Sequence, residues 1–133
     1  MSNSQLQKII SLYTAIVFIP TLLLYLIYSI FGWVVFSVTL NPLLGYFLLG
    51  GAYGLWSLDS LIKTMKNLTV LKHPIIVKLG LLLGCSFCPV VLTTAEFSTM
   101  KPQEFIFIYI IIAPFIATFH LFYLYKKQLV SAN

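Results

Sequence analysis

The feature that most constrains this chain is the absence of charge between Lys8 and Asp59, across a long and mostly apolar stretch. The whole chain is 60% apolar and only 8% charged, whereas soluble domains contain roughly 45–50% apolar and about 25% charged residues. In water, such a chain would expose more apolar surface than its few charges could keep in solution. We therefore expect an integral membrane protein whose main partner is the lipid bilayer.

Four apolar segments are expected to form helices, over residues 9–31, 43–62, 75–95 and 105–125. Each has about 20 residues, enough to cross a hydrocarbon core of about 30 Å. They must be helical because unpaired backbone groups cannot face lipid. The sequence predicts an all-α fold in which residues 1–133 form one transmembrane domain of two helical hairpins, with a connector at about 63–74.

The end of the first helix is the least defined boundary. Gly32 and Trp33 suggest that the chain leaves the membrane there, and Asn41-Pro42 is a turn that starts the next helix. We expect the helix to end in the low thirties, followed by a segment in the interface, although an extension to Val38 stays open.

The distribution of lysine predicts the orientation. All eight basic residues are lysine, and only Lys101 lies in a predicted outer segment. Excess lysine marks the cytoplasmic side, so both termini and the connector are expected there, in a plasma membrane of the bacterial inner-membrane type. Without arginine forks for phosphate, no nucleic-acid partner is expected. The other seven lysines are Lys8, Lys63, Lys66, Lys72, Lys78, Lys126 and Lys127.

Two G-x-x-x-G patterns lie in the second and third segments, formed by Gly50 with Gly54 and by Gly80 with Gly84. Small residues at this spacing let two helix backbones approach closely in a membrane. The favoured interpretation is that the two helices pack within one chain. The functional interpretation is that one pattern binds a helix of another protein or of a second copy.

Cys85 and Cys88 form a C-x-x-C motif, followed by Pro89. This spacing serves disulfide exchange and soft-metal binding, and the proline frees the carbonyl of Cys85. However, the motif lies near mid-membrane, where an apolar setting disfavours the reactive thiolate. Packing by two small residues is favoured, and a redox or metal site is the alternative.

Asp59 and His120 are ionisable residues at a similar expected depth. Intramembrane groups of this kind are candidates for function, and a His–Asp pair is able to relay protons or hold an ion. The simpler interpretation is an ion pair of Asp59 with Lys63, four residues later.

Prolines inside the predicted helices and tyrosines near their ends suggest two further structural features. Pro20, Pro89 and Pro114 are expected to bend three of the four helices. The tyrosines near helix ends are expected to form an aromatic belt at the membrane surface.

No set of residues suited to catalysis is visible, so a non-enzymatic protein without a cofactor is expected. The leading hypothesis is an accessory, assembly or immunity-type factor that binds an unidentified membrane protein. One alternative is a thiol-based carrier of soft metals or a disulfide-exchange subunit that uses Cys85 and Cys88. Another is a small transporter or flippase component around Asp59 and His120. Whether the chain also associates with itself stays open.

Overall fold

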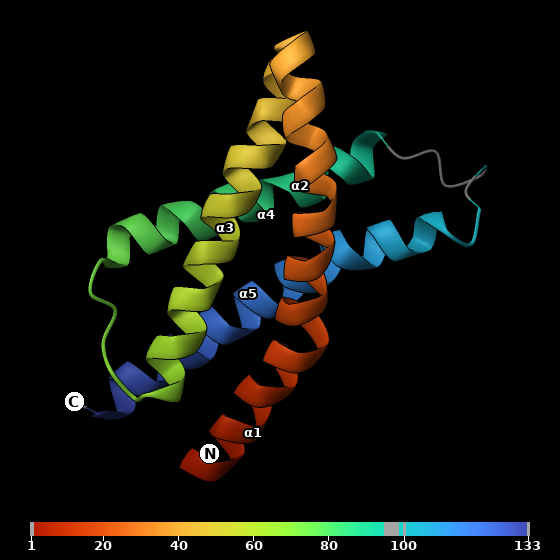
Figure 1. Cartoon of the computed structure of the whole chain (residues 1–133). Helices are drawn as coiled ribbons and strands as arrows, with labels where there is room; N and C mark the ends of the chain where they lie inside the picture. Colours follow the sequence, from red (N-terminus) through yellow and green to blue (C-terminus); the bar gives the residue numbers. More distant parts are fainter. Residues whose placement is uncertain (1, 95–98, 100, 133) are drawn as a thin grey trace.

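The structure is a computed structural model that describes residues 2–94, 99 and 101–132. The described residues form four helices and no strand (Figure 1). The first helix is continuous over Asn3–Thr39 and contains α1 (Asn3–Tyr13), a π-helical turn η1 (Thr14–Phe18) and α2 (Ile19–Thr39). The other three are α3 (Pro42–Lys66), α4 (Pro74–Thr94) and α5 (Glu104–Ala132).

The first helix does not end in the low thirties, so that expectation is wrong. It continues through Gly32, where the missing side chain leaves room for Leu48 of α3; a Cβ there would lie 3.0 Å from a methyl group of Leu48. The helix stops at Leu40, whose φ of 50° is left-handed, and the side chain of Asn41 then caps α3. At 1.5 Å per residue, its 37 residues measure about 55 Å.

The other helix boundaries agree more closely with the sequence. Pro42 and Pro74 are the first residues of α3 and α4, a position where the missing N–H of proline costs nothing. Glu104 opens α5, and its carboxylate accepts a hydrogen bond of 3.0 Å from the backbone N–H of Lys101. At its other end α5 runs past Tyr125 and reaches Ala132.

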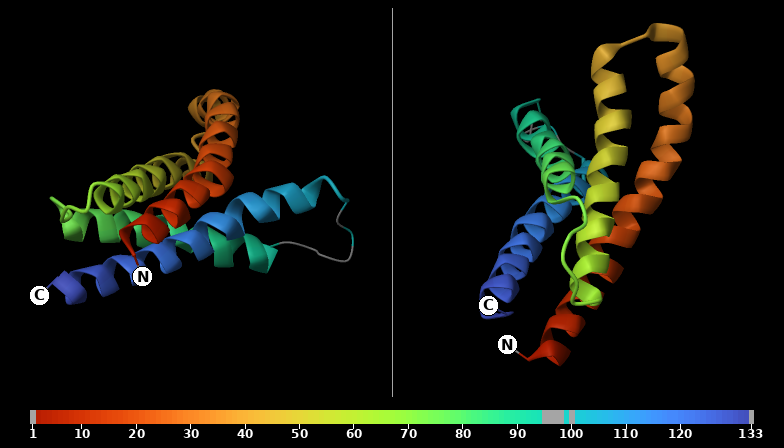
Figure 2. Two further views of the ribbon diagram at one scale, coloured as in Figure 1. Left: turned by 90° about the horizontal axis from the view of Figure 1, so that it is seen from below. Right: turned by 90° about the vertical axis from the view of Figure 1, so that its left-hand side faces the viewer.

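The helices cross instead of forming a parallel bundle. α2 and α3 run in opposite directions from a shared tip, and α4 and α5 pass across them (Figures 1 and 2). The most extensive packing joins α3 to α4, while α2 packs on α3 and α5. The pairing of helices into membrane hairpins, and the side on which the termini lie, stay predictions.

The buried core lies at one end of the molecule. It joins the start of α1, the second half of α3, the α3–α4 connector, the start of α4 and the last turns of α5. By contrast, α2 contains no buried residue at all. The core comprises Leu6, Ile10, Leu58, Leu61, Ile62, Met65, Leu71, Val77, Leu81, Leu121, Leu124 and Tyr125.

Two of the four helices are long and apolar enough to cross a membrane. They cover Asn3–Thr39 and Glu104–Val130, and α4 is apolar over the shorter stretch Pro74–Val90. With 25 residues, α3 is long enough to cross a membrane, but its glycines, its serines and Asp59 make it less apolar than the other two helices. Membrane placement of α3 and α4 therefore stays a prediction.

Candidate functional site

The predicted glycine patterns face each other between α3 and α4. A Cβ built on Gly54 would lie 2.8 Å from the Cα of Gly84, and one built on Gly84 would lie 3.1 Å from the Cα of Gly54. Two backbones therefore touch directly at this point, which only glycine permits. The contact explains why α3 and α4 pack so extensively.

The two remaining glycines make room for side chains. A Cβ on Gly80 would lie only 1.8 Å from Oγ of Ser57, and one on Gly50 would lie 2.9 Å from the ring of Phe87. Ser57 is fully buried, and its hydroxyl has no hydrogen-bond partner among the described residues. All four predicted glycines thus contact residues of this chain, as the favoured interpretation of packing within one chain predicts.

The two cysteines lie in different surroundings. Cys88 is buried, whereas Cys85 is half-buried and lies beside the side chain of Thr118 on α5. Both are free thiols. Among the described residues, no group of three or more His, Cys, Asp or Glu side chains is placed to hold a metal ion.

Asp59 and His120 each bind a different residue. The carboxylate of Asp59 forms an ion pair of 2.6 Å with Lys63, as the i,i+4 spacing predicts. Nδ1 of His120 is hydrogen-bonded to the hydroxyl of Tyr13, and the two rings meet edge to face at 5.5 Å. No ion pair joins Asp59 to His120, although both residues are described.

Tyrosine hydroxyls form most of the polar links between helices, which the sequence interpretation missed. Tyr25 donates to the carbonyl of Leu48, and Tyr109 donates over 3.1 Å to the carbonyl of Ile16. Tyr25 lies in the interior of the first helix, too far from its ends for an aromatic belt, whereas Tyr109 lies only five residues after the start of α5. Tyr13, Tyr46 and Tyr53 also link two helices, and the hydroxyl of Tyr125 accepts a hydrogen bond from the backbone N–H of Leu71 in the α3–α4 connector.

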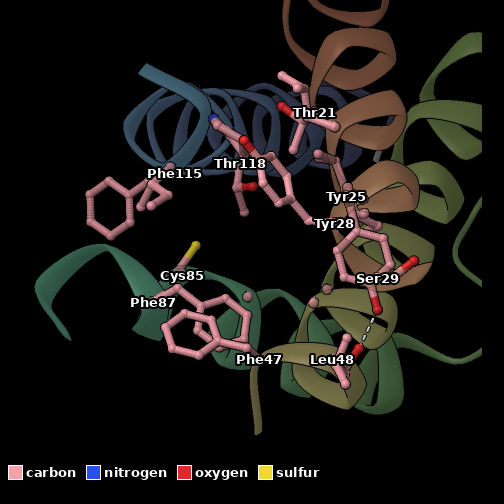
Figure 3. A pocket seen from close by; sticks show the side chains of 18 of the residues that line it. Thr21, Tyr25, Tyr28, Ser29, Phe47, Leu48, Cys85, Phe87, Phe115 and Thr118 are labelled. Carbon is pink, nitrogen blue, oxygen red and sulfur yellow. Dashed lines mark hydrogen bonds between the residues drawn. The ribbon is translucent and has the colours of Figure 1, made fainter. Parts of the chain in front are cut away.

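A cavity of ≈ 340 Å³ lies where the helices cross. Its lining comes from α2, α3, α4 and α5 and is mostly aliphatic and aromatic, and none of the described lining residues is charged. Figure 3 labels ten of them: Thr21, Tyr25, Tyr28, Ser29, Phe47, Leu48, Cys85, Phe87, Phe115 and Thr118.

Two contacts hold the walls of this cavity in place. The hydrogen bond from Tyr25 fixes α2 to α3, and the ring of Phe47 stacks on that of Phe87 with centroids 5.0 Å apart, which fixes α3 to α4 (Figure 3). The opposite wall comes from α5, where Phe115 and Thr118 face the space. The cavity is therefore bounded by side chains that also bind the helices to each other.

The chain matches no protein-family model, no curated protein and no solved structure.

Proposed function

We propose that this chain is an integral membrane protein with four spanning helices that acts by binding another membrane protein, without catalysing a reaction. The observation that carries the proposal is the surface of α2. This helix is strongly apolar, yet none of its 21 residues is buried. Phe31 and Val38, for example, are 70% and 81% exposed. Apolar surface on this scale is typical of a helix covered by lipid or by another protein.

The positions of the lysines support a common side for both termini. Lys78 on α4 and Lys126 on α5 lie over the same ring, that of Phe122, at 5.9 and 5.4 Å from its centroid. The start of α1, the α3–α4 connector and the end of α5 also share one hydrophobic core. These are the segments in which lysine is concentrated, so the positive-inside rule favours a cytoplasmic location for them. A bacterial plasma membrane is the proposed setting.

The partner is proposed to bind the outer half of α2. An apolar run from residue 9 to residue 40 is about 48 Å long. It fits a core of about 30 Å only if the helix tilts by about 50°, beyond the usual range of up to about 40°. Part of the run then lies outside the lipid, where another protein has to cover it. The most exposed apolar residues towards the tip are Ile30, Phe31, Val34, Val38, Leu40 and Leu43; we call this set the α2 tip surface.

The proposal is tested by isolating the chain from native membranes after brief crosslinking and identifying the proteins that accompany it. We expect one membrane protein at near-stoichiometric yield. A variant with Phe31→Ala and Val38→Ala should lower that yield at least tenfold. The matched control is Leu12→Ala, on the same continuous helix and 59% exposed, which should keep the yield within twofold. Isolation of the chain alone would contradict the proposal, and so would equal yields from both variants.

A further inference from the structure

The cavity at the helix crossing exists because two helices are kept apart. α2 packs on α3 and α5, and α4 packs on the same two helices, but extensive packing between α2 and α4 is absent from the described residues. The space between them is bounded by Tyr28 and Ser29 of α2 and by Cys85 and Phe87 of α4 (Figure 3). All four helices contribute to its lining.

The cavity lies near the middle of the helices that form it. Cys85 follows Pro74 by eleven residues in a helix of 21, a distance of about 16 Å. Thr118 follows Glu104 by fourteen residues in a helix of 29, about 21 Å along the axis. If these helices span the bilayer, as proposed above, the cavity lies within the hydrocarbon layer.

We propose that this cavity binds the hydrocarbon chain of an uncharged, single-chain lipid. Its ≈ 340 Å³ is at the low end of the range for ligand pockets, roughly 300–1,000 Å³, and this favours one chain over the two chains of a phospholipid. An apolar lining loses van der Waals contacts when the space is empty, and water does not occupy apolar cavities. A lipid chain restores those contacts.

The few polar atoms of the lining indicate which polar group the ligand carries. Thr21 on α2 and Thr118 on α5 present hydroxyl groups, and Cys85 on α4 presents its thiol (Figure 3). These groups are suited to hydrogen-bond a hydroxyl or an ester. They do not neutralise an ion, and a charge buried without a partner is strongly disfavoured. The ligand is therefore neutral where it meets the cavity.

The test uses a pair of neighbouring residues on α2. Leu24 lines the cavity, whereas Leu23 is 56% exposed and does not belong to its lining. The protein is reconstituted in phosphatidylcholine nanodiscs and labelled with hexadecanol that carries a photoreactive diazirine. An excess of plain hexadecanol should suppress labelling of cavity residues at least fivefold in the wild type and in Leu23→Trp. In Leu24→Trp, which fills the space, this suppressible labelling should be absent.

A second measurement does not depend on how Leu24→Trp folds. In a Cys88→Ser variant, Cys85 is the only thiol, so its reaction with N-ethylmaleimide reports on the cavity. We expect hexadecanol to slow this reaction at least threefold. Labelling that plain hexadecanol does not suppress, together with an unchanged reaction rate of Cys85, would overturn the proposal. Because neither measurement involves a protein partner, this proposal and the proposed function can fail separately.

Discussion

The hydroxyl of Tyr109 donates a hydrogen bond of 3.1 Å to the carbonyl oxygen of Ile16, on a helix far away in the sequence. Ile16 lies four residues before Pro20, which has no N–H with which to complete the helical hydrogen bond. The chain widens into the π-helical turn η1 at this point, where the N–H of Ile19 reaches back to the carbonyl of Thr14. One tyrosine of α5 thus supplies the donor that a proline of the first helix cannot.

We therefore predict that Tyr109→Phe destabilises the protein by about 1 kcal/mol, the usual scale for such bonds between membrane helices. Thermal unfolding in detergent or nanodiscs measures this change. Pro20→Ala restores the missing N–H, so the cost of Tyr109→Phe should largely disappear in the double variant. The matched control is Tyr123→Phe, since Tyr123 lies on the same helix and its hydroxyl makes no hydrogen bond to another helix among the described residues. An equal cost at both tyrosines would show that the link to Ile16 is unimportant.

The backbone contact between α3 and α4 leads to a second prediction. Gly54→Ala would place a methyl group against the Cα of Gly84, and neither backbone is able to yield without separating the helices. We expect a loss of about 1–3 kcal/mol, the usual scale of overpacking, measured by unfolding in detergent.

Gly32→Ala is the control for this substitution. Its new methyl group would meet only a methyl group of Leu48, at the end of a flexible side chain. Because alanine is favoured over glycine in a helix by about 1 kcal/mol, Gly32→Ala should be neutral or stabilising. If both glycine variants unfold alike, the contact of Gly54 with Gly84 does not control stability.

Ser57 provides a third prediction. Its hydroxyl is fully buried, has no hydrogen-bond partner among the described residues, and lies where Gly80 has no side chain. An unpaired buried hydroxyl costs about 1–3 kcal/mol, so Ser57→Ala should be neutral or stabilising. Ser60→Ala, which removes a hydrogen bond of 2.9 Å to the carbonyl of Trp56, is the comparison. A clear loss of stability in Ser57→Ala alone would mean that its hydroxyl is paired after all.

The cysteines provide a fourth prediction, which separates the proposed function from the thiol-based alternative. Replacing both Cys85 and Cys88 by serine removes every thiol of the chain. We expect the double variant to recover the same protein partner, within twofold, when isolated from crosslinked membranes. Loss of the partner in a variant that still inserts and folds would favour a function that depends on the thiols.

The sequence predicted the starts of the later helices because proline and asparagine act locally. Pro42 and Pro74 each follow a polar residue and are favoured in the first turn of a helix, and the side chain of Asn41 caps α3. The end of the first helix could not be predicted in this way. Gly32 usually weakens a helix, but here Leu48 from α3 occupies the space beside it, and that contact depends on tertiary structure.

In the candidate sites too, features set by local sequence were predictable, and features set by tertiary contacts were not. The mutual contact of Gly54 and Gly84 was predictable from small-residue spacing. The hydrogen bond between His120 and Tyr13 was not, because it depends on where α5 crosses the first helix. The cavity also results from that crossing. The pattern of residues along one helix does not predict the distance between two helices that are packed on others, such as α2 and α4.

The most direct test of the proposed function is site-specific photocrosslinking in native membranes. A benzoylphenylalanine is placed at Phe31, in the α2 tip surface, and separately at Leu79, an exposed residue of α4. The account predicts a discrete crosslink from position 31 to one protein, and only lipid adducts from position 79. Lipid adducts alone from both positions would contradict the claim that the α2 tip surface binds a protein partner.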